Sequence, residues 1–274
     1  VKARSDHKQP FFLYYAPLEP HVPLQPTQKW IDEYPTKWDP TPFRGGTGYL
    51  PHPRPKAAYA AMISQMDHNV GRLLDTLKAC GLENNTIVIF TSDNGTTHDV
   101  GGVDHKFFNS VAGLRGLKGQ LYEGGIRVPG IIKWPGKVTP GTIIDQPAYH
   151  ADIMPTLCAI VGAKPGKPLG TDLTPVILGK KKSLPNRNPM VWAGGGYGGQ
   201  VAVRLGDMKI VRRNLFPKKK PDNWEVYDIS KDPFEKNNLA AQHRDLIDKA
   251  IAILDREYRP SPGFPSLQYK AKES

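Results

Sequence analysis

The run "TIVIFTS" at residues 86–92 limits the possible folds more than any other stretch of this chain. It is continuous and rich in β-branched residues, which is typical of a strand covered on both faces of a sheet. Just before it, apolar residues recur at spacings of three and four from Ala58 to Leu77, so we predict an amphipathic helix that ends near Gly81. A helix that leads directly into a buried strand predicts an α/β fold.

Two other apolar runs predict further buried strands of the same sheet. They are "PFFLYYA" at residues 10–16 and "VPGIIKW" at residues 128–134. Residues 17–55 hold ten prolines, so we expect ordered loop there. We expect Asp152 to cap a helix that ends at Gly162. The fold predicted for this part is a mixed, largely parallel sheet flanked by helices.

The pattern changes after about residue 185. "VAVRLGDMKIVRR" predicts a hairpin around Gly206 and Asp207, "WEVYDI" a further strand, and residues 241–258 a terminal amphipathic helix. We therefore expect a small antiparallel sheet with one helix at the carboxyl end. The domain boundary is placed in residues 178–190, which gives domains at 1–184 and 185–274.

Composition excludes several classes of protein. The net charge of +11 comes largely from lysine runs such as 180–182 and 218–220, which prolines bracket, so we expect solvated loops and no nucleic-acid partner. An anionic substrate is compatible with this charge. No run approaches the ~18 apolar residues of a membrane helix, so no membrane span is expected. Cys80 and Cys158 lie in helix-like apolar patterns and are predicted to be buried thiols; a disulfide between them stays open.

Asp93 and Asn94 stand where the strand of residues 86–92 ends. Ligands gather at the carboxyl ends of strands in open α/β sheets, so this acid and this amide are candidate ligands for a hard cation such as Ca²⁺ or Mg²⁺. The alternative is an ordinary turn, because Asn-Gly after an apolar run is a turn signal. A metal site would need at least two more ligands.

The stretch "GLRGLKGQLYEGGIRVPGIIKWPG" at residues 113–136 offers cationic side chains among glycines that let backbone approach a ligand closely. Lys118 can hold one oxygen of a tetrahedral anion, and Arg115 is a candidate substrate contact. The alternatives are a solvated loop lysine and a surface ion pair between Glu123 and Arg127.

Histidines in two loops complete the candidate set. His21 follows the first predicted strand, where it could protonate a leaving group or bind an anion; a structural role is the alternative. His98 and His105, in "THDVGGVDHKFFN", are candidates for a substrate-pocket rim. Their spacing, with no cysteine nearby, is a poor zinc signature.

Taken in order, five segments of this chain resemble landmarks of type I sulfatases, the arylsulfatase-like members of the alkaline phosphatase superfamily. These segments are "YYAPLEPHVPLQP", "TSDNG", "GLKGQLYEGGIRVPGIIKWPG", "HADIMPTLCAIVG" and "VYDISKDPFEKNNLA". The resemblance runs from about Pro10 to about Leu254 and covers only the carboxyl-terminal portion of that family.

The resemblance implies a role for four of the candidate residues. Asp93 and Asn94 match the family's second pair of calcium ligands, Lys118 matches a lysine that holds the sulfate, and His21 matches a histidine on the sulfate and the leaving oxygen. It also implies a nucleophile that is a hydrated formylglycine, made from a cysteine or serine in a Cys/Ser-x-Pro-x-Arg motif. Its hydroxyl attacks sulfur in line, and the hemiacetal then collapses to release sulfate.

We expect no nucleophile within this chain. Neither Cys80 nor Cys158 lies in the required motif, and we expect no serine to be followed by x-Pro-x-Arg. The family's early Asp-Asp metal pair is missing too. Both elements precede the first landmark in the family, so the chain looks like a carboxyl-terminal piece of a longer protein. Two consequences are expected: weak Ca²⁺ binding by two ligands alone, and an uncovered core face with an unpaired sheet edge.

The leading functional hypothesis is that the parent protein hydrolyses an aryl or sugar sulfate ester. The alternatives are a phosphate or phosphonate monoester hydrolase of the same superfamily, and a non-catalytic module that binds anions or glycans. The family implies an exported parent, in the periplasm, outside the cell or in a lysosome-like compartment. Nothing in the sequence itself assigns the compartment, the oligomeric state or the natural substrate.

Overall fold

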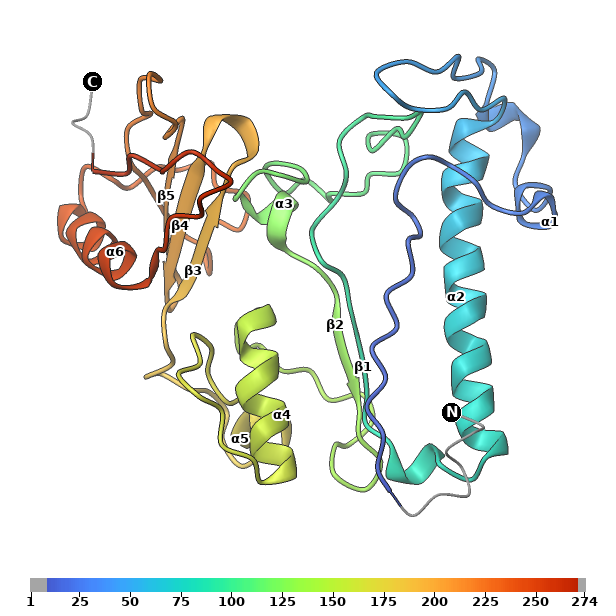
Figure 1. Cartoon of the computed structure of the whole chain (residues 1–274), viewed down its shortest axis with the longest axis horizontal. Helices are drawn as coiled ribbons and strands as arrows, with labels where there is room; N and C mark the ends of the chain where they lie inside the picture. The colour runs from blue at the N-terminus through green and yellow to red at the C-terminus, as the bar shows by residue number, and fades with distance from the viewer. Residues whose placement is uncertain (1–8, 271–274) are drawn as a thin grey trace. The chain divides into compact units, whose positions relative to one another are not determined.

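The computed structural model describes residues 9–270, and Figure 1 follows the chain through its helices and strands. The chain divides into two compact units. The first contains the chain up to Phe90 together with Thr97–Ser110 and Ile131–Gly136; the second contains Thr91–Thr96, Val111–Gly130 and the chain from Lys137 onward. The sequence-based domain boundary in residues 178–190 stays a prediction.

The first unit is organised around the long helix α2 (Pro55–Ala79), which confirms the predicted helix. A proline starts it, and Gly81, at φ +67°, follows its end. The preceding loop is largely irregular, as expected, with two single turns, α1 (Gln28–Ile31) and η2 (Thr36–Trp38). Its apolar side chains pack on the first turns of α2, in clusters made of Val22, Leu24, Ala58, Tyr59, Met62 and Val103, and of Ile31, Ala57 and Ala61.

After a short turn, η3 (Glu83–Asn85), come the two strands β1 (Val88–Thr91) and β2 (Gly130–Lys133), which form a two-stranded hydrogen-bonded sheet. Both were predicted, but the expectation that their faces are covered is wrong for the described residues. Ile89 is 43% exposed and Ile131 is 61% exposed. β-branched side chains of this kind are typical of a strand that is buried on both faces. Among the described residues no third strand joins β1 and β2, so these side chains stay exposed.

The predicted buried strand at residues 10–16 is not present. The segment has no regular secondary structure, and Phe12 is 79% exposed and Tyr14 81% exposed. The physical reason is that a strand exists only through pairing with a neighbour, and no described strand pairs with this segment. A contiguous exposed apolar stretch of this kind marks an interaction surface.

The second unit contains a four-stranded antiparallel sheet in the order β3-β4-β5-β6. Its strands are β3 (Met190–Gly194), β4 (Gln200–Leu205), β5 (Met208–Arg213) and β6 (Glu225–Asp228), and a one-turn helix, η5 (Gly196–Gly198), links β3 to β4. The predicted hairpin is confirmed, with Gly206 and Asp207 as the two loop residues between paired Leu205 and Met208.

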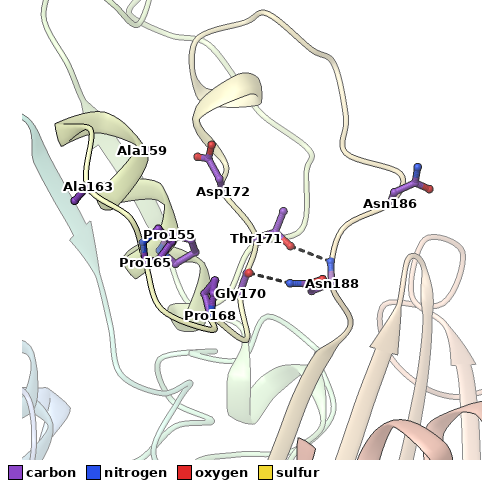
Figure 2. A pocket seen from close by; sticks show the side chains of 10 residues that line it. All are labelled: Pro155, Ala159, Ala163, Pro165, Pro168, Gly170, Thr171, Asp172, Asn186 and Asn188. Carbon is purple, nitrogen blue, oxygen red and sulfur yellow. Dashed lines mark hydrogen bonds between the residues drawn. The ribbon is translucent and has the colours of Figure 1, made fainter. Parts of the chain in front are cut away.

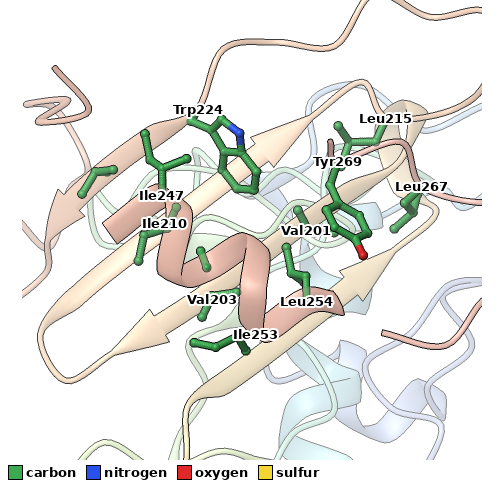
Figure 3. Packing of buried hydrophobic residues seen from close by; sticks show 12 residues of the cluster. Val201, Val203, Ile210, Leu215, Trp224, Ile247, Ile253, Leu254, Leu267 and Tyr269 are labelled. Carbon is green, nitrogen blue, oxygen red and sulfur yellow. The ribbon is translucent and has the colours of Figure 1, made fainter. Parts of the chain in front are cut away.

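One face of this sheet packs on the terminal helix α6 (Arg244–Glu257), whose existence the sequence predicted. Successive residues of a strand point to opposite faces, so Val201 and Val203 of β4 reach α6 while Ala202 faces away. Figure 3 shows α6 lying over the strands with its apolar side chains directed at them. The buried members of this cluster are Val201, Val203, Ile210, Leu215, Trp224, Val226, Ile247, Ala250, Ile253, Leu254, Leu267 and Tyr269.

The opposite face of the sheet carries the loop of residues 111–127, which includes the short helix α3 (Glu123–Ile126). Tyr122, just before α3, is buried in a cluster with Ala202 of β4, Val211 of β5 and Tyr227 of β6. The loop that contains Lys118 is therefore built onto a rigid sheet.

The remaining helices of this unit are α4 (Ile153–Val161), with η4 (His150–Asp152) before it, and α5 (Thr174–Ile177). Gly162 ends α4 in the left-handed region at φ +72°, as predicted. Asp152 does not cap α4 through its side chain, so that prediction is wrong. Its buried carboxylate instead accepts hydrogen bonds from the backbone N–H of Tyr149 (2.9 Å) and Thr171 (2.8 Å) and pairs with Arg187 (3.0 Å).

Cys80 and Cys158 are free thiols, and both are half-buried rather than fully buried. In this structure the two sulfurs therefore form no disulfide. Residues of α4 and of the following loops line a cavity of about 420 Å³, which Figure 2 shows from close by. None of the predicted site residues lines this cavity. Among the described residues, no helix is long and apolar enough to cross a membrane.

Candidate anion and metal site

Two loops of the second unit are hydrogen-bonded to each other, and together they contain three of the predicted site residues. The N–H of Gly95 donates to the carbonyl of Gly125 (2.9 Å), and the N–H of Thr96 donates to that of Gly124 (3.2 Å). The N–H of Lys118 donates to the carbonyl of Thr96 (2.6 Å). Asp93, Asn94 and Lys118 therefore lie on adjoining loops.

Asp93 and Asn94 lie directly after β1, as the sequence placed them. Asp93 is exposed, and its Oδ1 accepts a long hydrogen bond from Ser92 Oγ (3.4 Å). Asn94 is half-buried and donates its Nδ2 to the carbonyl of Gly95 (2.9 Å), so its Oδ1 is the side-chain atom that can serve a cation. The two residues thus offer carboxylate and amide oxygens, which are the ligands Ca²⁺ prefers.

These ligands do not make a calcium site by themselves. Ca²⁺ takes roughly six to eight oxygens, and residues 9–270 contain no group of three or more His, Cys, Asp or Glu side chains placed to hold a metal ion. The donor chemistry fits a cation, but the number of donors does not. No catalytic step is therefore assigned to a metal held by this chain alone.

Lys118 presents a cation with no competing partner. Within the part of the chain that the structure describes, its Nζ makes no hydrogen bond or ion pair. The side chain is half-buried, and its backbone is fixed by the bond to Thr96. A positioned ammonium group of this kind suits one oxygen of a tetrahedral anion.

The guanidinium group of Arg115 binds other side chains of this chain. Nη1 lies 3.1 Å from Glu225 and donates to the hydroxyl of Tyr227 (2.7 Å), while Nη2 donates to the hydroxyl of Tyr122 (2.9 Å). Burial, reinforced by the Glu225 carboxylate, raises the pKa of both tyrosines. These contacts support a structural role for Arg115, so its role as a substrate contact stays a prediction.

A buried ionic cluster lies beneath α3 and was not anticipated from the sequence. Lys209, on the loop-facing side of β5, is fully buried, and its Nζ lies 2.9 Å from Glu123 and 2.9 Å from Glu235. The N–H of Glu123 also donates to Glu235 (2.7 Å). Burial raises the pKa of Glu235, although Lys209 counteracts it. Glu123 is therefore a buried anchor and not half of a surface pair, although Arg127 lies 3.7 Å from it.

Gly124 has no space for a side chain, which gives a direct test of the loop packing. A Cβ there would overlap the carbonyl oxygens of Gly116 and Arg115, both of which belong to the same loop. We expect Gly124→Ala to destabilise the second unit by about 1–3 kcal/mol, as measured by chemical denaturation. Gly130→Ala is the control, because a Cβ at Gly130 meets nothing within 4 Å. Equal stability of the two variants would contradict this packing.

The predicted histidines belong to the first unit. His21 is exposed, and its Nδ1 bonds the carbonyl of Val22 (2.7 Å). His105 Nδ1 lies 2.5 Å from Asp99 Oδ1. His98 Nδ1 is buried and, among the described residues, has no hydrogen-bond partner. Their roles in catalysis and substrate binding stay predictions.

The chain does contain one Ser-x-Pro-x-Arg pentapeptide, at residues 183–187, so the expectation that no such motif occurs is wrong for the sequence. Its position differs from that of the family motif, since it follows the Lys118 landmark instead of preceding the first one. The arginine of this pentapeptide, Arg187, has other partners within the protein. Arg187 pairs with buried Asp152 at 3.0 Å and donates to the carbonyl of Pro147. Nothing in this arrangement makes Ser183 a nucleophile at the candidate site.

Comparison with known families decides what kind of protein contains these loops. A family model described as Sulfatase matches residues 2–163, more than half of the chain. This chain belongs to the sulfatase family. A second model, described as N-sulphoglucosamine sulphohydrolase, C-terminal, matches residues 117–256, which include the Lys118 loop and the antiparallel sheet. The predicted relation to type I sulfatases of the alkaline phosphatase superfamily is confirmed, and with it the α/β fold class.

Similar sulfatases are found among both sequences and structures. A sulfatase of Formosa agariphila is 31% identical over 89% of this chain and 44% of its own length. An N-acetylgalactosamine-6-O-sulfatase of Bacteroides thetaiotaomicron is 30% identical over 92% of this chain and 48% of its own. The crystal structure of Ps i-CgsB in complex with a neocarrahexaose superimposes with a TM-score of 0.75 and 26% identity, over 93% of this chain and 51% of that one. The chain thus spans about half the length of these relatives.

Proposed function

We propose that the parent protein of this chain hydrolyses the sulfate ester of a sugar. The observation that supports the proposal is the backbone hydrogen bonding between the loop of Asp93 and Asn94 and the loop of Lys118, because residues with oxygen ligands and a residue with an ammonium group then belong to adjoining loops. In this proposal Lys118 holds a sulfate oxygen, and Asp93 and Asn94 supply two ligands of a Ca²⁺ ion, with Mg²⁺ as the alternative. His21 contacts the leaving oxygen.

The sugar substrate is proposed from the relatives that match most of the chain. One is named as an N-acetylgalactosamine-6-O-sulfatase, and another was solved as a crystal structure in complex with a neocarrahexaose. Relatives named steryl-sulfatase and arylsulfatase A match shorter parts, 44% and 64% of this chain. Because the sugar-related matches extend over the antiparallel sheet and α6, they support a sugar more than an aryl ester.

We further propose that residues outside this chain supply the nucleophile and the remaining metal ligands. The exposed segment at residues 11–18 and the open faces of β1 and β2 are where those residues would pack. An exported parent fits this proposal.

This proposal predicts that residues 1–274 alone release no sulfate. The chain should be assayed with 4-nitrophenyl sulfate and with N-acetylgalactosamine 6-sulfate in the presence of Ca²⁺, beside the parent protein at equal concentration. The parent should release sulfate, and the chain should stay at the background rate. Sulfate release by the chain alone would overturn the assignment of the nucleophile. Weaker inhibition of the parent by inorganic sulfate than by phosphate would favour a phosphate ester instead.

A further inference from the structure

Residues 194–199, the last residue of β3 and the link to β4, hold five glycines around a single tyrosine. Tyr197 adopts φ 49° and ψ 42°, the left-handed region, which is unusual for a bulky residue. The residue is 50% exposed. Strained backbone of this kind persists only where the surroundings enforce it, and it concentrates at functional sites. Neither the fold nor the site described above accounts for this aromatic residue.

The glycine-rich segment is clamped to the turn that follows Lys118. Gln200, the first residue of β4, is fully buried. Its Nε2 donates to the carbonyl of Gly196 (2.9 Å) and to that of Gly119 (2.8 Å), and its Oε1 accepts from the N–H of Leu121 (3.3 Å). One buried amide therefore joins the two loops, so their relative position is fixed by the sheet.

This clamp places the ring of Tyr197 against the residue after Lys118. A Cβ added at Gly119 would lie 3.0 Å from Cε2 of Tyr197, so the ring packs over the open side of that glycine. Gly196 approaches the same turn closely, since its own added Cβ would lie 2.5 Å from the Gly119 oxygen. A half-exposed aromatic residue thus lies against the neighbour of Lys118, whose ammonium group makes no hydrogen bond or ion pair with any residue in 9–270.

We propose that Tyr197 is a specificity-determining residue, the face on which the sugar ring of the ester rests while Lys118 holds its sulfate. The inference depends on the proposed function and extends it to the organic half of the substrate. Ligand sites combine aromatic walls with a few polar anchors, and a tyrosine offers an apolar face together with a hydroxyl for a sugar oxygen. Because the clamp already fixes the backbone, little conformational entropy is lost on binding.

The test uses the parent enzyme with Tyr197→Gly, and Tyr197→Phe as the matched variant. Glycine adopts the left-handed region without strain, so the loop keeps its path while the ring is removed. The substrate is N-acetylgalactosamine 6-sulfate or a sulfated carrageenan oligosaccharide, whichever the parent hydrolyses faster. We expect Tyr197→Gly to raise KM about tenfold with kcat nearly unchanged. Tyr197→Phe keeps the ring and loses the hydroxyl, so its KM should lie between those of the parent and of Tyr197→Gly. The inhibition constant of inorganic sulfate should not change in either variant.

Three results would overturn the assignment. An unchanged KM in Tyr197→Gly would mean that the ring of Tyr197 does not contact the substrate. A parallel loss of affinity for inorganic sulfate would mean that the substitution acts through the Lys118 loop. A higher KM for 4-nitrophenyl sulfate but not for the sugar would assign the ring to aryl esters. Failure of the proposed function looks different, because the unsubstituted parent would then hydrolyse neither sulfated sugar.

Discussion

Replacing Lys118 by alanine should lower kcat/KM of the parent enzyme for a sulfate ester by about 100-fold. The equatorial oxygens of the sulfuryl group gain or keep negative charge as the ester bond breaks, so a fixed cation beside them stabilises the transition state. In this chain the ammonium group has no partner among the described residues, and its backbone is tied to Thr96 at 2.6 Å. The charge is therefore available and positioned.

Lys133→Ala is the matched control for this experiment. Lys133, the last residue of β2, belongs to the same sequence landmark as Lys118. It pairs with Glu83 at 2.8 Å and has no proposed contact with substrate. Its removal should leave kcat/KM unchanged. Lys118→Arg, which keeps the charge in a different shape, should fall between alanine and the parent. Full activity of Lys118→Ala in a folded protein would exclude Lys118 from the site.

Replacing Lys209 by methionine should cost the second unit about 3–5 kcal/mol of stability at neutral pH. The substitution removes the counter-ion that Glu123 and Glu235 share, since both carboxylates are buried and both lie 2.9 Å from the ammonium nitrogen. Glu235 then loses the cation beside it, and Glu123 keeps Arg127 at 3.7 Å, a longer distance than that to Lys209. Urea denaturation followed by the fluorescence of tryptophans such as buried Trp224 measures the loss.

The sign of the pH dependence follows from Glu235. Its native pKa already lies above the ordinary 4.5 because of burial, and loss of Lys209 raises that pKa further. A carboxyl group with a raised native pKa favours folding below its ordinary pKa, and this contribution is lost as the pH rises through the native value. The defect of Lys209→Met should therefore be largest at pH 7 and shrink towards pH 4.5.

Two further variants control this prediction. Lys231→Met removes a side chain that is 84% exposed and pairs with Asp228 on the surface, so no measurable change is expected. Adding Glu123→Gln and Glu235→Gln to Lys209→Met should recover part of the lost stability, because neutral amides need no counter-ion. A defect that grows in acid, or one no larger than that of Lys231→Met, would contradict the buried cluster.

Features set by neighbouring residues could be predicted from the sequence. The helix α2 follows from apolar spacing and from Gly81 at its end, and the hairpin follows from a two-residue Gly-Asp turn between alternating strands. Asp93, Asn94 and Lys118 each lie in a landmark segment, and the loops that contain them adjoin in the structure. Their roles stay predictions that rest on the family resemblance.

Features set by distant partners could not be predicted in the same way. "PFFLYYA" has the composition of a strand, yet in the described chain it has no neighbour to pair with. The ionic cluster joins residues 123, 209 and 235, whose proximity depends on the whole sheet. The sequence could have indicated that Lys209 is unusual, because it stands between Met208 and Ile210 and therefore lies on the opposite face of the predicted strand from these two apolar residues. Its partners required the tertiary structure.

Side chains on the loop-facing side of the antiparallel sheet should affect both the folding and the activity of this protein. Gln200, Lys209 and Glu225 sit on three different strands, and each binds the Lys118 loop directly. Selection for a well-folded sheet and selection for turnover therefore act on the same side chains. In a deep mutational scan of the parent, these positions should lose abundance and activity together, whereas Tyr197 should lose activity while abundance is retained.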